Sequence, residues 1–425
     1  MPIPHLSNVQ TGPLLELEGR ILTAQPQIEH WFRSQWHAHA TPFYGSVDLR
    51  NSGFKLAPVD MNMFPGGFNN LNPEFIPLAV QAAMSAVDKV CPEAKSLLLI
   101  PENHTRNTYY LQNVAALANI FELAGLHVRL GTLNPEITEP TEFLAANGAA
   151  VRLEPIVRRG NRLLLADGFN PCMVLLNNDL SAGIPSLLQN IEQHLLPPLH
   201  AGWAVRRKSH HFQAYDSVAS EFAQLISIDP WLINPLFSSC SGLDFQSRQG
   251  EQALADTVSD LLAKIRVQYR EHQIPHEPFV IVKADAGTYG MGVMSVKSPE
   301  DVLALNRKAR NKMSVVKEGL EVSEVIVQEG VYTFETVEDA VAEPVVYMMD
   351  RFVIGGFYRV HTGRGIDENL NAPGMYFAPL SFESACLPDR TGTPDCAANR
   401  FYSYGVIARL ALLAGARELE ATDPN

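Results

Sequence analysis

A lysine followed by a glycine-rich loop is the feature of this sequence that points most directly to chemistry. The segment FVIVKADAGTYGMGVMSV (279–296) contains an apolar run that ends at Lys283, then Gly287, Gly290 and Gly292, then a second β-rich run. This order predicts a β-hairpin whose tip can fold over a ligand. Glycine permits close backbone approach, and backbone N–H groups with one ammonium suit phosphate oxygens. An ordinary glycine-rich turn beside a solvated lysine is the alternative interpretation.

The two common phosphate-binding loops do not match this segment. Its spacing is Gly-x-x-Gly-x-Gly, no Lys-Ser or Lys-Thr pair follows the last glycine, and a strand follows where those motifs need a helix. If this segment binds phosphate, it does so through neither of these two motifs.

Composition sets further limits on function. The chain has 425 residues, 46% hydrophobic and 19% charged, which is typical of a soluble globular protein with two or three domains. Its net charge of −13 argues against nucleic acid or an anionic membrane as the main partner, and leaves a homo-oligomer open. Positive charge for an anionic ligand must therefore be gathered locally.

The cysteines and the hydropathy pattern indicate a cellular compartment. Five cysteines lie far apart without a CxxC pair, which predicts a reducing environment and no zinc site. Cys386 and Cys396 bracket a turn-rich loop and are either a redox pair or idle thiols. We see no signal peptide in MPIPHLSN and no apolar run of about 18 residues, so we expect a cytoplasmic protein.

Hydrophobic periodicity predicts an α/β domain over residues 1–195. Helices are expected at 13–40 and 73–90, and SLLLIP, TYYLQNVAALANIFELAGL and HVRLGTL give a β-α-β alternation. The run CMVLLNNDLSAGIP repeats the pattern of an apolar strand followed by a polar turn. Such alternation implies a parallel sheet covered by helices, with ligands at the carboxyl ends of the strands.

The remaining residues divide into two further predicted units, 196–330 and 331–425. Helices are expected at 215–225, 251–272, 298–313 and 402–420. The run VSEVIVQEGV predicts a strand that ends at Gln328 and Glu329, and EPVVYMMDRFVIGGFYRVHTG predicts a strand pair turning at Gly355 and Gly356.

Four features occur in a diagnostic order: the lysine strand with its glycine hairpin, the Val-Gln-Glu strand end, a strand pair bearing Arg359, and the loop ENLNAPG. Over residues 200–425 this order resembles the ATP-grasp superfamily, in which two α+β lobes hold ATP. Within it, the strand pair and the Asn-rich loop resemble bacterial glutathione synthetases. With PVDMNMFPGGFNNLNP near its start, nearly the whole chain resembles a proteobacterial family of glutamate–cysteine ligases.

That resemblance implies the first step of glutathione synthesis. ATP would phosphorylate the γ-carboxylate of glutamate, and the amine of cysteine would displace the phosphate. Another ATP-grasp carboxylate–amine ligase, such as glutathione synthetase, is a second hypothesis. A regulatory ATP-binding module without catalysis is a third, although Lys283, the glycine hairpin and Arg359 together argue against it.

The resemblance also implies roles at the nucleotide site. Lys283 and the hairpin glycines would hold the phosphates, while Gln328, Glu329 and Val331 would hold adenine through backbone groups. Glu335 would reach the ribose hydroxyls, or is simply solvated. Arg359 would stabilise charge on the transferring phosphoryl group; the alternative is a surface ion pair with Asp367 or Glu368.

Magnesium is expected to accompany ATP, held by oxygen ligands with some waters retained. The last strands carry no clear copy of the acidic set found in glutathione synthetases. Glu368, Asn369 and Asn371 are the substitutes by position, with Glu343 and Asp350 as rivals.

Candidate substrate-binding residues come from three segments. Asp60, Asn62, Asn69 and Asn70 flank a turn at Gly66 and Gly67 that forms either a backbone nest for a carboxylate or a structural loop. The second segment, Arg106 and Asn107, lies just past a predicted strand, as do Asn178 and Asp179. In the third, Arg206, Arg207 and Lys208 form a basic cluster that suits a carboxylate or the γ-phosphate, or is a solvated helix face.

Overall fold

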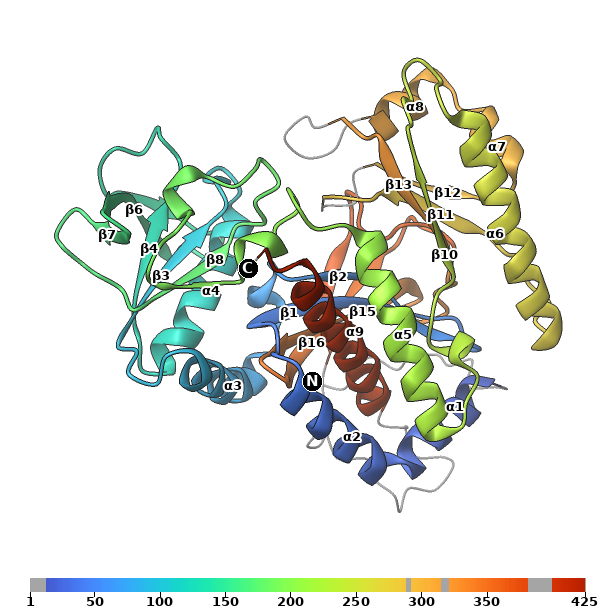
Figure 1. The fold of residues 1–425 in the computed structure, drawn as a ribbon, viewed down its shortest axis with the longest axis horizontal. Helices are drawn as coiled ribbons and strands as arrows, with labels where there is room; N and C mark the ends of the chain where they lie inside the picture. Colours follow the sequence, from blue (N-terminus) through green and yellow to red (C-terminus); the bar gives the residue numbers. More distant parts are fainter. Residues whose placement is uncertain (1–12, 288–291, 315–320, 381–399, 425) are drawn as a thin grey trace.

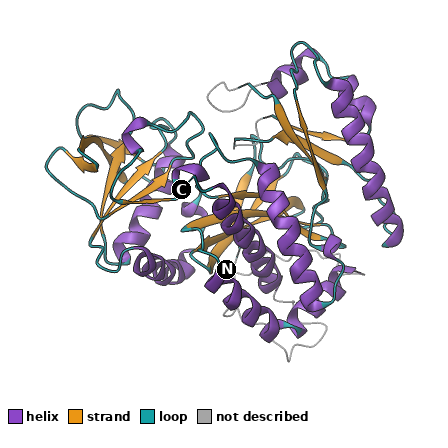
Figure 2. Ribbon diagram, viewed as in Figure 1, coloured by secondary structure: helices purple, strands orange, loops and turns teal. Residues whose placement is uncertain are grey.

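The protein is built on three β-sheets, and the computed structural model describes residues 13–287, 292–314, 321–380 and 400–424. A parallel-stranded sheet lies at the left of Figure 1, a hairpin-containing sheet at the upper right, and a central antiparallel sheet between them. Figure 2 shows the same arrangement with the helices packed outside the sheets. The chain is thus a mixed α/β protein.

The central sheet joins segments from both halves of the sequence. Its order is β17-β16-β15-β1-β2, with β14 added beside β15, and every pairing is antiparallel. The strands are β1 (Tyr44–Asn51), β2 (Leu56–Asn62), β14 (Thr336–Val337), β15 (Ala340–Met349), β16 (Phe352–His361) and β17 (Tyr376–Pro379). The pairing of β1 with β15 aligns Val47 with Val346, which connects residues almost 300 positions apart.

The predicted parallel sheet is confirmed in the N-terminal half. Strands β6, β4, β3, β8 and β9 are parallel in that order, and β5 and β7 add to β6 in antiparallel fashion. The strands are β3 (Ser96–Pro101), β4 (His127–Thr132), β5 (Thr141–Leu144), β6 (Ala150–Arg159), β7 (Arg162–Leu165), β8 (Met173–Asn177) and β9 (His194–Leu196). Helix α4 (Thr108–Leu123) packs against this sheet, whereas α3 (Ile76–Val90) packs on α4 and on β15 and β16 of the central sheet.

The predicted glycine hairpin forms part of the third sheet, whose order is β10-β13-β11-β12. The strands are β10 (Phe237–Ser241), β11 (Val280–Ala284), β12 (Val293–Val296) and β13 (Glu324–Glu329). Helix α6 (Glu251–Glu271) covers it. The helix expected at 298–313 is two helices, α7 (Pro299–Leu303) and α8 (Arg307–Ser314). The hairpin tip, with Gly290, lies outside the described residues.

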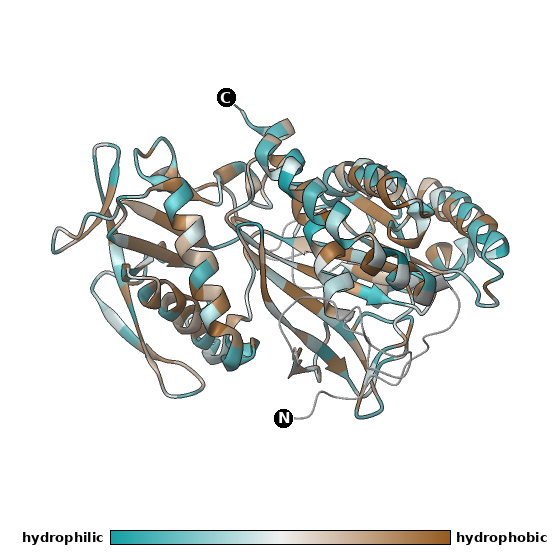
Figure 3. Cartoon of the chain, turned by 90° about the horizontal axis from the view of Figure 1, so that it is seen from below, coloured by the Kyte–Doolittle hydropathy of each residue, from teal (hydrophilic) through white to brown (hydrophobic). Residues whose placement is uncertain are grey.

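Four helices cover the central sheet: α1 (Pro13–Thr23), α2 (Gln25–Ala38), α5 (Lys208–Ile226) and α9 (Arg400–Thr422). The sequence predicted a single helix over 13–40, but Pro26 in the first turn of α2 lacks an N–H and so a new helix begins there. Hydropathy colouring shows apolar residues on many strands, and helices that carry both apolar and polar residues (Figure 3). The apolar residues of these four helices pack with those of the central strands. The main core therefore lies between the central sheet and this helical layer.

The division of the chain at residue 195 needs one correction. Strands β1 and β2 fall within the range 1–195, yet they belong to the same sheet as β15, β16 and β17. The physical reason is that β1 is flanked on both sides by strands, and its partner β15 comes from far along the sequence. Periodicity within one segment cannot report such a non-local pairing.

The turn expected at Gly355 and Gly356 is also wrong. The chain reverses at Asp350 and Arg351, where Asp350 has φ +49°, a left-handed conformation that aspartate tolerates. Gly356 lies inside β16, next to a register shift in its pairing with β15. A side chain there would place Cβ 2.4 Å from the carbonyl oxygen of Val345, so the glycine is needed for close strand approach.

We expect Gly356→Ala to destabilise the protein by about 1–3 kcal/mol, because the added methyl forces two central strands apart. Gly19→Ala is a suitable control: Gly19 is exposed in α1, with nothing within 4 Å of an added Cβ. It should stabilise by up to about 1 kcal/mol through helix propensity. Calorimetric melting of both variants measures the difference, and equal melting temperatures would contradict the steric argument.

Candidate functional site

Two cavities meet at the central sheet. The larger, about 790 Å³, lies between the central sheet and the carboxyl ends of the N-terminal strands. The smaller, about 110 Å³, lies between the central sheet and the hairpin sheet. Four residues line both: Asp48, Asp60, Arg359 and Asn371. Ligands in the two cavities would therefore approach each other at these side chains.

Arg359 is the central cation of this junction. Its Nη1 donates to Asp48 Oδ2 at 2.9 Å and to Glu343 Oε1 at 2.6 Å. Glu343 in turn accepts from Arg50 Nε at 2.9 Å. The alternative of a surface pair with Asp367 or Glu368 is wrong, because the strand register aligns Arg359 with Glu343 inside the sheet. Arg359 Nε is buried without a hydrogen-bond partner, which leaves one donor unused.

Burial and neighbouring charges shift the pKa values of three ionisable groups in this network. Burial raises the pKa of Asp48 even though Arg359 opposes the shift, and Glu343 adds to it. For Glu343, burial is outweighed by Arg50 and Arg359, which lower the pKa of its carboxyl. Burial likewise opposes the charge of Arg359, but Asp48 and Glu343 raise its pKa. The guanidinium is therefore permanently charged.

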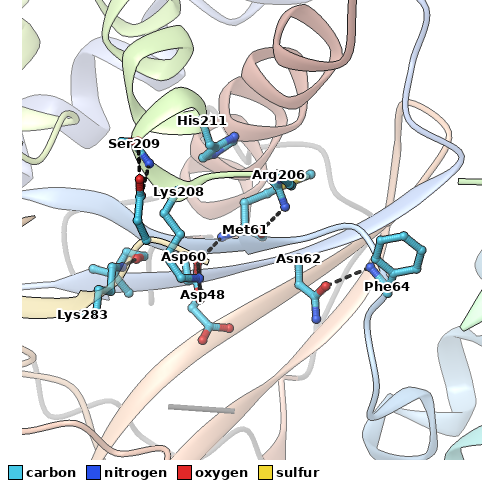
Figure 4. A network of polar contacts seen from close by, with 12 residues as sticks. Asp48, Asp60, Met61, Asn62, Phe64, Arg206, Lys208, Ser209, His211 and Lys283 are labelled. Carbon is cyan, nitrogen blue, oxygen red and sulfur yellow. Dashed lines mark hydrogen bonds and ion pairs between the residues drawn. The ribbon is translucent and has the colours of Figure 1, made fainter. Parts of the chain in front are cut away.

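Two lysines lie on the other side of the junction, at the edge strand β2 (Figure 4). Lys208 Nζ binds both oxygens of Asp60, at 2.8 and 2.9 Å. Burial disfavours the Asp60 anion, but Lys208 and Lys283 outweigh it and lower its pKa to about 2. Asp60 is consequently an anion at any physiological pH.

Lys283 lines the smaller cavity, at the end of β11. Its Nζ donates to the carbonyl oxygen of Val59 at 2.6 Å, and its side chain is buried rather than solvated. Burial lowers the pKa of Lys283 to about 8, against attraction from Asp60. The adjoining Gly287 and Gly292 have φ of +96° and +61°, conformations that favour glycine.

The predicted adenine residues Gln328, Glu329 and Val331 also line this cavity. The Glu329 carboxylate is not available to a ligand, since it accepts from Lys55 Nζ at 2.7 Å and from Trp231 Nε1. Gln328 Nε2 is buried without a partner.

Glu335 lies away from the lining of both cavities. It is neither solvated nor facing the nucleotide cavity: its carboxylate is buried and accepts hydrogen bonds from Asn51 Nδ2 at 2.8 Å and from the Tyr404 hydroxyl.

The basic cluster at 206–208 is divided among three environments. Arg206 is buried and pairs with Glu418, Arg207 pairs at the surface with Glu324 at 3.3 Å, and Lys208 binds Asp60. These consecutive residues, which lead into the first turn of α5 at Lys208, contact different partners, so the three cations do not form one anion site. Arg207 lines a separate cavity of about 240 Å³ beside Gly287.

The Pro-Gly-Gly turn of residues 65–67 forms the wall of the larger cavity, but its nest is already filled. The N–H groups of Gly67 and Phe68 both donate to Asn113 Oδ1, at 2.7 and 2.9 Å. The Tyr347 hydroxyl donates to the carbonyl oxygen of Gly66. A helix α4 amide thus takes the place expected for a substrate carboxylate. The side chains of Asn62, Asn69 and Asn70 remain lining residues.

The strand-end pair 106–107 is split. Asn107 caps α4, accepting from Tyr110 N at 3.1 Å, and lines the larger cavity. Arg106 is exposed and does not line it. Of the other strand-end residues, Asp179 lines the cavity.

The metal ligands expected from the Asn-rich loop are only partly at the junction. Asn369 lines the smaller cavity and Asn371 lines both, whereas the Glu368 carboxylate binds Arg364 and the N–H of Gly365. Asp350 is remote, held by Lys89 beyond the end of β15. Over the described ranges, no cluster of three or more His, Cys, Asp or Glu side chains could hold a metal by itself.

Sequence reasoning missed several residues of the junction. Asp48 and Arg50 lie on β1, and Ser46 lines the larger cavity from the same strand. The alternation of Ser46, Asp48 and Arg50 with Val47 and Leu49 has the period of a strand with one polar face, so the signal was present. Asn113 and Asn177, which connect the Pro-Gly-Gly turn to the N-terminal sheet, carried no such signal.

Comparison with known proteins identifies the family. The glutamate-cysteine ligase family model matches residues 18–419. The chain belongs to this family. It is therefore a carbon–nitrogen ligase that makes γ-glutamylcysteine for glutathione, which confirms the first of the three hypotheses.

Solved structures agree. The chain is similar to a candidate gamma-glutamylcysteine synthetase from Methylobacillus flagellatus KT, with 67% identity, full coverage of both chains and a TM-score of 0.92. A glutathione synthetase-like effector from Globodera pallida matches at 12% identity, covering 86% of this chain and 80% of its own, with a TM-score of 0.38. D-alanyl-alanine synthetase A from Vibrio cholerae matches at 11% identity, covering 75% of this chain and 81% of its own, with a TM-score of 0.34. The last two scores are too low to assign a fold.

Among curated proteins, none matches this chain. No helix in the described part of the chain is long and apolar enough to cross a bilayer. Cys386 and Cys396 lie outside the described residues.

We expect Asn113→Leu to destabilise the protein by roughly 1–3 kcal/mol, because two backbone N–H groups lose their acceptor while the branched shape of the side chain is kept. It should also weaken substrate binding, since the Pro-Gly-Gly turn forms the cavity wall. Asn119→Leu on the exposed face of α4 is the matched control and should leave both properties unchanged. Melting temperature and the KM for glutamate are the measurements. Unchanged values for both variants would show that the turn does not need Asn113.

Proposed function

We propose that ATP binds in the smaller cavity and the two amino acids bind in the larger one, with the reacting groups meeting at Arg359. The observation that carries this proposal is the shared lining of the two cavities by Asp48, Asp60, Arg359 and Asn371. A reaction that transfers a phosphoryl group from a nucleotide to an amino acid needs such a junction. The family is ATP-dependent, which fits two adjoining sites.

The residues of the smaller cavity suit a nucleotide. Lys283 lines this cavity and supplies a compact positive charge where the hairpin begins. Gly287 and Gly292, which follow it along the hairpin outside the cavity lining, have backbone conformations that favour glycine and allow close approach to phosphates. The polar atoms at the end of β13, including the unpaired Gln328 amide, suit the base. These assignments give the hairpin sheet and the central sheet the roles of the two ATP-grasp lobes, and the unit from α3 to β9 that of the substrate domain.

The proposed chemistry has two steps. A γ-carboxylate oxygen of glutamate attacks the γ-phosphorus of ATP, and the bond to the bridging oxygen breaks to release ADP. The neutral amine of cysteine then attacks the acyl carbon, the C–O bond to phosphate breaks, and the amine nitrogen loses a proton. Arg359 stabilises the charge on the phosphoryl group in both steps, and its unpaired Nε is a donor for this purpose.

Magnesium fits the donor set of the junction. The Asp48 and Asp60 carboxylates and the Asn371 amide are oxygen donors that line both cavities, and Mg²⁺ is usually held by one or two carboxylates plus substrate phosphates and water. We propose these three as its holders, with Asn62 beside them. When bound, the ion neutralises phosphate charge.

The test is ADP release by the purified protein across amino acid pairs. Glutamate with cysteine should give γ-glutamylcysteine and ADP, and glutamate with 2-aminobutyrate should also react, because the amine and not the thiol is the nucleophile. Glutamate alone should give little ADP. A strict need for the thiol, or turnover only with γ-glutamylcysteine and glycine, would refute the proposal.

The low pKa of Lys283 predicts a pH-dependent affinity for ATP. Below about pH 8 the ammonium is charged and attracts phosphate; above it, the free protein increasingly carries a neutral amine. ATP affinity should therefore fall from about pH 8 upward, by up to about tenfold per unit.

In Lys283→Arg the side chain stays charged at high pH, so the fall of ATP affinity above about pH 8 should disappear. Lys297 is an exposed lysine that pairs with Asp367, and Lys297→Arg should still show the fall in ATP affinity. Calorimetric titration with ATP at several pH values measures the slope. A flat wild-type profile would remove Lys283 from the phosphate site.

A further inference from the structure

Arg206 and Glu418 form a deeply buried ion pair behind the site. Each side chain exposes only 2% of its surface. Two nitrogens of Arg206 bind the two carboxylate oxygens of Glu418, Nε at 2.9 Å and Nη2 at 3.0 Å. Arg206 comes from the segment before α5, and Glu418 comes from the last turns of α9. The pair thus joins elements that are 212 residues apart.

The third nitrogen of this arginine reaches the candidate site. Arg206 Nη1 donates to the carbonyl oxygen of Met61 at 2.9 Å. Strand β2 is the edge of the central sheet, so carbonyl groups on its outer side have no strand partner. A buried carbonyl oxygen needs a hydrogen-bond donor, and the guanidinium of Arg206 is that donor for Met61. Lys283 donates in the same way to the carbonyl oxygen of Val59, which lies two residues before Met61 on β2.

Met61 is flanked by two residues that line the larger cavity, Asp60 and Asn62. Because side chains alternate along a strand, these two share one face while the Met61 side chain is buried in the core on the other. The peptide that Arg206 holds therefore sets the direction of both cavity-lining side chains. Figure 4 shows Arg206 beside Met61, with Asp60 and Asn62 on either side along the strand.

We propose that Arg206 and Glu418 are positioning residues of the ligation reaction, which fix the edge of β2 so that Asp60 and Asn62 meet the reacting groups. The inference rests on the proposed function, in which these side chains face the phosphoryl transfer. Neither Arg206 nor Glu418 lines the larger cavity or the smaller one. Both act through the backbone of β2, where a displacement of about 1 Å can cost about a hundredfold in rate.

The same helix carries a matched control. Arg409 of α9 also binds both carboxylate oxygens of Glu29 of α2, but through Nη1 at 2.9 Å and Nη2 at 2.7 Å, where Arg206 uses Nε and Nη2. Among the described residues, Arg409 and Glu29 make no hydrogen bond to β2. Arg206→Lys and Arg409→Lys each keep a positive charge and lose a two-point contact. The control pair is more exposed, at 13% for Arg409 and 44% for Glu29, so the melting temperatures are compared together with the kinetic values.

The experiment compares these two variants with the wild-type protein in steady-state kinetics, Mg²⁺ titration and melting. In Arg206→Lys we expect kcat/KM for glutamate to fall about ten- to hundredfold and the half-saturating Mg²⁺ concentration to rise. The KM for ATP should change less than about threefold, because β11 and β13 supply other walls of that cavity. Arg409→Lys should stay within about twofold of the wild type in all kinetic values.

A purely structural role predicts a different result. Lowered melting temperatures in both variants, with Arg206→Lys kinetically equal to Arg409→Lys, would overturn the inference. Glu418→Asp, with Glu29→Asp as its control, repeats the test by shortening the carboxylate that orients the fork. Loss of folding in both Arg206→Lys and Glu418→Asp would likewise assign the pair to stability alone. An inactive wild-type protein would instead refute the proposed function.

Discussion

The antiparallel pairing of β1 with β15 is the interaction on which the rest of the structure depends. It places Asp48 of the N-terminal segment next to Glu343 and Arg359 of the C-terminal segment. A sheet with several carboxylates and guanidinium groups on one face is costly unless every charge is paired, because desolvation disfavours each isolated ion. Asp48, Arg359, Glu343 and Arg50 meet that requirement as a chain of alternating sign.

The edge of the same sheet is closed in an unusual way. No strand pairs with the outer side of β2 among the described residues; instead Arg206 and Lys283 donate to its carbonyl groups, and Lys208 holds Asp60. Lys283 comes from the hairpin sheet, Lys208 is the first residue of α5, and Arg206 lies just before that helix. The edge strand is therefore the point at which the hairpin sheet, the helical layer and the central sheet are coupled. Such coupling suits an enzyme that must align two substrates.

Buried charge also connects the two sheets that enclose the smaller cavity. Lys55, next to β2, binds Glu329 at the end of β13, and both side chains expose about 1% of their surface. Burial lowers the pKa of Lys55 to about 8, opposed by the attraction of Glu329. Removing one partner of such a pair leaves an uncompensated charge, which is far more costly than the pair is stabilising. The relative placement of the sheets is thus specific rather than adaptable.

The sequence predicted local elements well where one segment carried its own pattern. The glycine hairpin at Lys283, the parallel β-α-β half and the terminal helix are all confirmed, since each depends on periodicity and turn chemistry within about 30 residues. Partners that come from other elements could not be predicted in this way. The Gly67 N–H, expected either in a nest for a carboxylate or in a structural loop, donates to Asn113, and the Glu335 carboxylate, expected at the ribose or in solvent, accepts from Asn51.

By itself, then, the amino-acid sequence indicated the family and the parallel sheet of the N-terminal half, and it singled out Lys283 and Arg359, which line the smaller cavity. Only the tertiary structure decided which charged side chains line a cavity and which are paired with another side chain of the protein. Arg206 and Lys208 illustrate the difference, since two neighbouring cations serve Glu418 and Asp60 respectively. The reason is physical: a buried charge takes whichever counter-charge the fold brings within hydrogen-bond distance, and that distance is set by non-local strand pairing, which no local pattern encodes.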